Sequence, residues 1–202
     1  MKPNVASAAV PLSSFLKTHC RLTAVILAGT KGSRLFPMTS SETPKHLLPV
    51  AGIPSILRLL ETLVNFPEIV IAISPEDGQT KKVVENVAKL KDDKGDIWIF
   101  ESSNNQKITL VKLGEECFGP VDALRQVETS DVIDSQSRVV VFPGDLVFLK
   151  KDLDLGPLLR LDTDSACTAL LVDVGEVDEH GVPLKESAKV SNDHSTVKED
   201  GH

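Results

Sequence analysis

Unbroken apolar runs alternate along this chain with segments whose apolar residues recur at helical spacing. A strand covered on both faces, as in a parallel sheet, needs no alternation of polar and apolar residues. The pattern therefore predicts strands at Thr23–Ala28, Glu68–Ser74, Arg138–Phe142 and Ser165–Val174, with one or two more at Trp98–Phe100 and Ile108–Leu113. We expect the first three of these runs to be central, neighbouring and mostly parallel.

Helical periodicity fills the gaps between the runs. Pro54 suits the first turn of a helix, and after it one face carries Ile56, Leu59, Leu60, Leu63 and Val64. The same spacing predicts helices at Asp77–Leu90, through Val83, Val84, Val87 and Leu90, and at Pro120–Glu128 and Asp152–Leu161. Strands and helices in this order predict an α/β, Rossmann-like fold, a mainly parallel sheet flanked by helices, with ligands where the strands end.

The two ends of the chain differ in composition from its middle. Residues 1–20 are rich in Ser and Ala, and we expect a poorly ordered N-terminal extension. Its only strong bases are Lys2 and Lys17, and Pro11 interrupts its apolar run, which disfavours a transit peptide. Residues 21–184 carry the α/β pattern. Residues 185–202 are polar and lack aromatic side chains, so we expect a disordered tail.

Charge and cysteine usage narrow the class of partner. The net charge of -7 over 202 residues disfavours binding to nucleic acid or to an anionic membrane. No apolar stretch approaches the roughly 18 residues of a membrane span. No acidic residue precedes Glu42, so the first segment could hold an anion, although a chance run explains it equally well. The cysteines Cys20, Cys117 and Cys167 lack metal-ligand spacing, which favours the reducing cytosol.

A glycine-containing loop directly follows the first predicted strand. Gly29 and Gly32 allow a tight turn and let backbone N–H groups approach a phosphate. Arg34 can hold phosphate oxygens through two parallel hydrogen bonds. Ser33 has no base partner in the sequence that would make it a nucleophile. The spacing is neither that of the dinucleotide fingerprint nor that of the Walker loop.

Residues 27–54 read LAGTKGSRLFPMTSSETPKHLLPVAGIP. This segment resembles the signature of the sugar-nucleotide pyrophosphorylase superfamily, L-A-G-G-x-G-T-R-L-x-P-L-T followed by P-K-x-L-L-P-V-x-G-x-P. The resemblance implies a nucleotidyltransferase fold. It also implies nucleotide contacts from Gly29, Gly32, Ser33 and Arg34, and a contact of Lys45 with the sugar phosphate or pyrophosphate. A catalytic role for Arg34 and Lys45 follows only if the domain is active.

Two later segments fit the same resemblance. Gly119 and Asp122 lie where the family has G-T-A-x-A-L, a turn that meets the base and sugar. Asp122 is also an ordinary first-turn acid of a helix. Asp145 ends a buried strand where the family places an aspartate that binds magnesium. We expect no required cofactor, and Mg²⁺ only if nucleotide binding is retained.

The departures from the signature indicate which members of the superfamily the chain resembles most. Thr30 replaces a glycine, Pro120 and Val121 replace Thr and Ala, and the family's second metal-binding aspartate lies beyond these 202 residues. The form K-G-S-R-L-x-P-x-T is most similar to the gamma-type subunits of eukaryotic translation initiation factor 2B, and less similar to the epsilon type. That resemblance implies a non-catalytic scaffold supporting guanine-nucleotide exchange on initiation factor 2. Its partners would be the other 2B subunits, especially epsilon, with no nucleic acid or membrane.

Two alternatives remain open at this level. The first is an active pyrophosphorylase that condenses a nucleoside triphosphate with a sugar 1-phosphate. The second is an incomplete product of a longer gene. Single residues also have simpler interpretations: Lys45 as a solvated loop lysine, Asp145 as a cap, and His46 as a surface or packing residue rather than a metal ligand. Leu47, Leu48 and Val50 are expected in the core.

Overall fold

The structure is a computed structural model that describes residues 21–148, apart from 30–31, 33–34, 41–42 and 118. The predicted helix at Asp152–Leu161 and the predicted strand at Ser165–Val174 lie outside the described residues, as do the expected extension at 1–20 and tail at 185–202.

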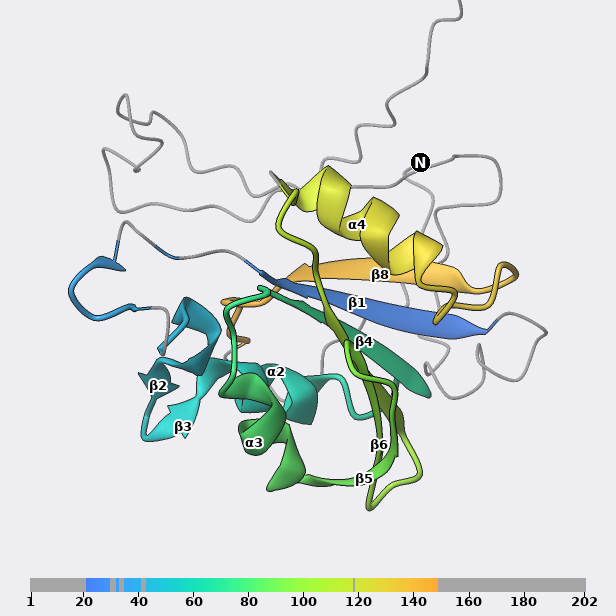
Figure 1. The fold of residues 1–202 in the computed structure, drawn as a ribbon. Helices are drawn as coiled ribbons and strands as arrows, with labels where there is room; N and C mark the ends of the chain where they lie inside the picture. The colour runs from blue at the N-terminus through green and yellow to red at the C-terminus, as the bar shows by residue number, and fades with distance from the viewer. Residues whose placement is uncertain (1–20, 30–31, 33–34, 41–42, 118, 149–202) are drawn as a thin grey trace, which may run out of the picture. The chain divides into compact units, whose positions relative to one another are not determined.

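The described residues form a six-stranded, mainly parallel sheet (Figure 1). Its order is β5-β6-β7-β4-β1-β8, and the strands are β1 (Leu22–Ala28), β4 (Glu68–Ile73), β5 (Ala88–Asp93), β6 (Ile97–Ser102), β7 (Lys107–Lys112) and β8 (Arg138–Pro143). β1 pairs in parallel with both β4 and β8, and β4 pairs in parallel with β7. The predicted central strands are therefore neighbours and parallel, as expected.

Helices cover both faces of the central strands (Figure 1). α2 (Ser55–Thr62) and α3 (Thr80–Glu85) lie on one side of β1 and β4, and α4 (Pro120–Thr129) lies on the other. A short 3-10 helix, η2 (Lys45–Leu47), and a hairpin of β2 (Pro49–Val50) and β3 (Ile53–Pro54) precede α2. No helix among the described residues has the length and apolar character needed to cross a membrane.

The core follows from the apolar character of β1 and β4 on both faces. Successive side chains of a strand point to opposite faces, so a run without polar residues supplies both layers. On one face Val25, Val70 and Val111 pack with Ala123 and Val127 of α4. Ile26 and Ile71, one residue further along their strands, are fully buried, as are Ile56, Leu59 and Leu63 in and just after α2. The predicted stripe of α2 is confirmed except at Val64, which is 44% exposed.

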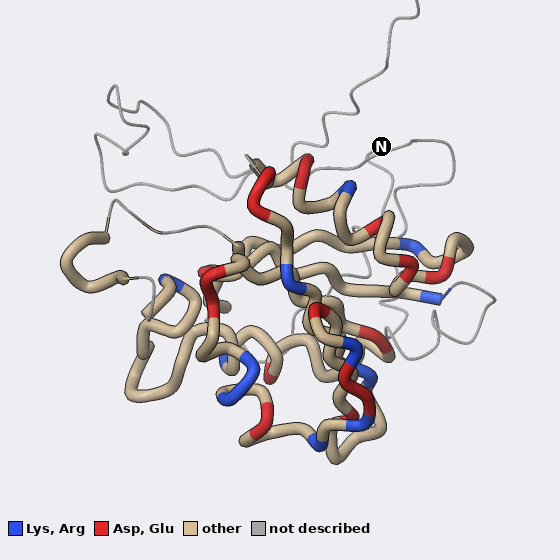
Figure 2. The backbone as a smooth tube through the Cα atoms, viewed as in Figure 1, with Lys and Arg blue, Asp and Glu red and all other residues tan. Residues whose placement is uncertain are grey.

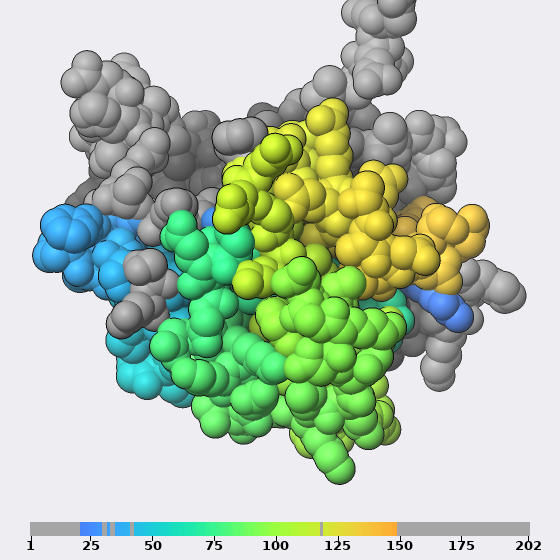
Figure 3. Space-filling model, viewed as in Figure 1, coloured from blue at the N-terminus to red at the C-terminus, as the bar shows by residue number. Residues whose placement is uncertain are grey.

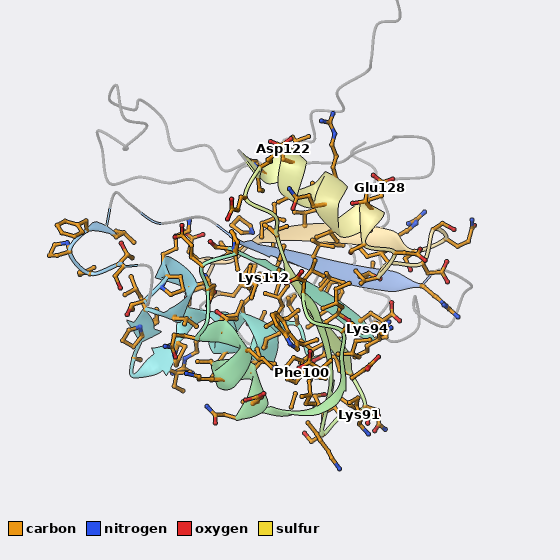
Figure 4. The ribbon with its side chains drawn as sticks, in the orientation of Figure 1. Lys91, Lys94, Phe100, Lys112, Asp122 and Glu128 are labelled. Atoms are coloured by element: carbon orange, nitrogen blue, oxygen red, sulfur yellow. The ribbon has the colours of Figure 1, made fainter. Side chains whose placement is uncertain are left out.

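The sequence prediction was wrong between Asp77 and Leu90. The helix α3 ends at Glu85, and Ala88 begins β5, which pairs antiparallel with β6. Val87 and Leu90 are therefore exposed instead of completing a helical stripe. Pairing with β6, whose Phe100 is fully buried (Figure 4), takes residues 88–93 into the sheet. Of the four apolar residues at helical spacing, Val83 and Val84 lie in α3, whereas Val87 and Leu90 lie beyond its end.

β8 corrects a second expectation. Its apolar run suggested a strand covered on both faces, but Val139 and Val141 are 44% and 42% exposed. Among the described residues β8 stands at the end of the strand order, beside β1 alone. Phe142 of the same strand is buried and meets Phe66 edge-on, with ring centroids 5.9 Å apart. One face of β8 thus belongs to the core and the other does not.

Candidate functional site

Gly144 brings the carboxyl ends of β1 and β8 together, and Gly29 lies close to Leu113, the residue that follows β7. The Gly144 backbone N–H donates to the Leu27 carbonyl at 2.9 Å. A Cβ at Gly144 would lie 2.9 Å from the Ala28 Cα, so no side chain fits there. A Cβ at Gly29 would lie 2.7 Å from Cδ1 of the buried Leu113. These close approaches place the residue after Gly144, the predicted metal ligand Asp145, at the edge where the glycine loop begins.

The second glycine of the loop packs against Lys45. Gly32 has a φ of +62°, in the left-handed region that favours glycine, and a Cβ there would lie 3.0 Å from the Lys45 Cβ. The Thr39 hydroxyl donates to the Gly32 carbonyl at 2.8 Å and holds the returning chain in place. Thr30, Ser33 and Arg34 lie outside the described residues.

Lys45 and Asp145 form an ion pair. The Lys45 Nζ donates to the Asp145 Oδ2 at 2.8 Å, and the two side chains are 19% and 43% exposed. The predicted sugar-phosphate ligand and the predicted metal ligand therefore meet at one edge of the sheet, beside Gly32. A lysine ammonium is a compact cation with three donors, and a carboxylate is the oxygen ligand that Mg²⁺ prefers. The arrangement can hold a phosphate group and a hard cation side by side.

The remaining predicted contacts lie at the start of α4. Gly119 precedes the helix, Pro120 opens it, and Asp122 lies in its first turn, as expected (Figure 4). Because β7 is parallel to β4 and β4 to β1, α4 begins at the same sheet edge where β1 ends. Asp122 carries an ion pair with Arg125 at 3.9 Å, and the Val121 side chain is 60% exposed. Gly119 and Asp122 thus lie where the sequence places them, at the start of α4, beside an exposed apolar side chain.

A buried polar cluster that the sequence did not predict lies next to Lys45, around His46. His46 is fully buried, and its Nε2 lies 2.7 Å from the Thr80 Oγ1 and 3.1 Å from the Asp77 Oδ2. Asp77 also accepts hydrogen bonds from the backbone N–H groups of Gln79 and Thr80. Burial by itself would raise the pKa of Asp77. The hydrogen bonds from His46 and Thr80 outweigh it and lower that pKa from 3.8 to about 2.

The burial of His46 agrees with its expected role in packing, but the core positions expected for Leu47, Leu48 and Val50 are corrected. His46, expected at the surface or in packing, is the fully buried residue of η2, whereas Val50 is 41% exposed and Leu47 and Leu48 are only partly buried. The hairpin β2–β3 takes Val50 away from the sheet, so its side chain has no layer to pack on. A hint was present in the sequence, because an Asp just before a segment of helical apolar spacing is a helix-start signal. Nothing in the sequence joined it to His46.

The wider surface of the described part offers no second site of this kind. Among the described residues there is no group of three or more His, Cys, Asp or Glu side chains placed to hold a metal. Acidic and basic residues intermingle over β5 and β6 (Figure 2), where Lys91 pairs with Glu101 and Lys94 with Asp92. Three exposed apolar residues, Leu35, Phe36 and Met38, lie close together in sequence after the glycine loop. They belong to the segment drawn in blue at the left margin of Figure 3.

Comparison with known proteins connects this geometry to a family. Residues 23–189 match the model of the nucleotidyl transferase family. A candidate glucose-1-phosphate thymidylyltransferase from Bacillus anthracis, solved in complex with sucrose, is 27% identical, with a TM-score of 0.50 over 72% of this chain and 51% of that one. No curated protein gives a significant match.

Two more distant structures share the fold. HddC from Yersinia pseudotuberculosis is 19% identical, with a TM-score of 0.53 over 79% of this chain and 65% of that one. A UDP-glucose pyrophosphorylase from Acinetobacter baumanii is 12% identical, with a TM-score of 0.54 over 75% of this chain and 55% of that one. The predicted Rossmann-like α/β fold is confirmed. This chain spans between about half and two thirds of the length of these proteins.

Proposed function

The chain belongs to the nucleotidyl transferase family, and we propose that the edge formed by Gly29, Gly32, Lys45 and Asp145 binds the phosphate groups of a nucleotide. The observation that carries the proposal is the Lys45–Asp145 pair at 2.8 Å beside Gly32. On ligand binding the Lys45 ammonium passes from the carboxylate to phosphate oxygens. Asp145 would then be the carboxylate that could hold a Mg²⁺ ion, and such an ion would neutralise part of the phosphate charge.

We further propose that the domain is a gamma-type subunit of eukaryotic translation initiation factor 2B, working in the cytosol. In this role it is a non-catalytic scaffold that supports guanine-nucleotide exchange on initiation factor 2 through its other 2B partners, epsilon above all. The support lies in the substitutions at the nucleotide loops. Thr30 replaces a glycine of the signature, and Pro120 and Val121 remove a hydroxyl and add bulk. Val121, the second residue of α4, is apolar and 60% exposed.

A sugar-nucleotide pyrophosphorylase is the alternative, favoured by the 27% identity to the candidate thymidylyltransferase. In that reaction an oxygen of a sugar 1-phosphate attacks the α-phosphorus of a nucleoside triphosphate, and pyrophosphate leaves. Lys45 would bind the phosphoryl oxygens on which negative charge develops. A bound Mg²⁺ would add Lewis-acid stabilisation of the same charge.

One pair of measurements separates the two functions. The whole chain is assayed for pyrophosphate release with each nucleoside triphosphate and a panel of sugar 1-phosphates, with Lys45→Ala as the blank. It is also used as bait, and the captured proteins are identified by mass spectrometry. The scaffold role predicts no turnover and capture of other initiation factor 2B subunits. Turnover of about 1 s⁻¹, a low but ordinary value for an enzyme, that is lost in Lys45→Ala would reject the scaffold in favour of the transferase.

A further inference from the structure

The imidazole of His46 connects the turn that carries Lys45 to the start of α3. Its Nε2 faces the Thr80 Oγ1 at 2.7 Å and the Asp77 Oδ2 at 3.1 Å, and both the His46 and Asp77 side chains are buried. The Thr80 hydroxyl donates its proton to the Asp77 Oδ2 at 2.6 Å. Because the Thr80 proton is used in that bond, the contact of 2.7 Å between the His46 Nε2 and the Thr80 oxygen requires a proton on Nε2. The geometry assigns the Nε2–H tautomer to His46.

Only one of the two ring nitrogens of His46 forms hydrogen bonds with the described residues. The His46 Nδ1 is buried and has no hydrogen-bond partner among the described residues. In the Nε2–H tautomer that nitrogen carries a lone pair and leaves no buried N–H group unpaired. Among the described residues, the hydrogen bonds of the ring are therefore those to Thr80 and Asp77.

The backbone of the same residue is fixed by a second element. The Ser55 hydroxyl, at the first position of α2, donates to the His46 carbonyl at 2.9 Å. The Ser55 N–H donates to the Leu48 carbonyl at 3.1 Å, just after η2 ends. The turn is thus held from both helices that cover this face of the sheet, and Lys45 is its first residue.

We propose that His46 is a positioning residue of this site: by tying the Lys45 turn to Asp77 and Thr80, it aims the Lys45 ammonium at Asp145. That this position matters for function rests on the proposed phosphate-binding role of Lys45. A long lysine side chain loses much rotamer freedom when held in one geometry. Its stem packs on Gly32, but only a fixed turn keeps the backbone at the distance that the pair requires.

Chemical acetylation of the amines in the whole chain tests the proposal without a nucleotide. The rate at Lys45 is followed by mass spectrometry and compared with the rate at Lys81. Lys81 is a matched control, because its Nζ pairs with Asp93 at 2.8 Å and its side chain is 28% exposed, close to the 19% of Lys45. It also lies next to Thr80, so it reports any loosening of α3.

Two substitutions of similar size separate positioning from general packing. In His46→Gln the amide nitrogen reaches the place of Nε2 and can still donate to Thr80. In His46→Asn the side chain reaches only as far as Nδ1. We expect acetylation of Lys45 to rise about two- to fivefold in His46→Asn, the range for loss of a partly exposed ion pair. His46→Gln should stay near the wild-type rate, and Lys81 should not change in either.

Thr80→Val provides a second route if His46→Asn fails to fold, because it removes only the hydroxyl that Nε2 contacts; it too should raise the Lys45 rate. An unchanged Lys45 rate in the folded variants would overturn the proposal, and so would an equal rise at Lys45 and Lys81. Adding nucleotide with Mg²⁺ to the wild type tests the proposed function separately. Absence of protection at Lys45 would count against phosphate binding and leave the positioning result intact.

Discussion

The Lys45 Nζ lies 2.8 Å from the Asp145 Oδ2, across 100 residues of sequence. Exposed ion pairs contribute only about 0–1 kcal/mol to folding, and the Asp145 carboxylate of this pair is 43% exposed. The pair is therefore a minor part of what holds the domain together. Its importance is geometric, because it brings the proposed phosphate ligand Lys45 and the proposed metal ligand Asp145 together near the end of β1.

Replacing Lys45 should separate stability from binding. Lys45→Ala is expected to change the free energy of unfolding by less than about 1 kcal/mol. Losing a charge-assisted hydrogen bond to phosphate costs about 1.5–3 kcal/mol, so nucleotide affinity should fall roughly ten- to a hundredfold. Arg34→Ala should act in the same direction. Titration of labelled nucleotide measures this, with Lys81→Ala as the control, and equal binding by all four proteins would show that the loop is not a site.

Gly144→Ala should destabilise the domain. Its Cβ would lie 2.9 Å from the Ala28 Cα and 3.0 Å from the Leu27 carbonyl oxygen, and neither backbone atom can move aside cheaply. Forcing extra atoms into a packed region typically costs about 1–3 kcal/mol. The matched control is Gly78→Ala, where an added Cβ meets nothing within 4 Å. Urea unfolding of both variants gives the comparison, and equal midpoints would mean that the ends of β1 and β8 are not in close contact.

The free energy of unfolding should depend on pH at the acid end because of Asp77. Its pKa is lowered from 3.8 to about 2 in the folded state, so folding favours the carboxylate. The stabilisation that the Asp77 carboxylate gives to the folded state is fully present above pH 3.8 and disappears as the pH falls through about 2. At about 1.4 kcal/mol per unit of pKa difference, it amounts to roughly 2 kcal/mol.

Asp77→Asn keeps a side-chain oxygen that can accept from the start of α3 but has no charge to titrate. We expect the gap in stability between wild type and this variant to be widest near neutral pH and to close with acid. Asp131→Asn serves as the exposed comparison. Parallel stability curves for wild type and Asp77→Asn throughout acid titration would contradict the assigned hydrogen bonds.

The buried side chain of Gln106 should contribute to the stability of the domain. Its Nε2 donates to the carbonyls of Leu63 and Phe66 at 2.8 and 2.7 Å, just beyond the end of α2, and the residue is 7% exposed. Gln106→Ala leaves buried carbonyl groups without this donor, so we expect a loss of about 1–3 kcal/mol. Gln126→Ala removes an exposed bond to the Gly114 N–H, which water can replace, and should cost about 0.5 kcal/mol or less. Thermal unfolding distinguishes the two.

The sequence by itself determined the central layer of this protein and the place of its loop. β1 and β4 are apolar from Ala24 to Ala28 and from Ile69 to Ile73 because both faces of those strands are covered there, and burial acts on each of these residues. The glycines after β1 follow from the same local logic, since a tight turn and a close backbone approach need a missing Cβ. These features depend on neighbours in sequence and can be derived from it.

Only the tertiary structure decided which distant residues meet. Residues 88–93 became a strand because β6 was available for pairing, against a helical spacing that continued to Leu90. Val139 and Val141 are exposed on β8, which pairs with β1 at the end of the described order. The contacts of Lys45 with Asp145 and of His46 with Asp77 join segments 100 and 31 residues apart. Such pairings depend on strand order and register, which the local apolar pattern does not encode.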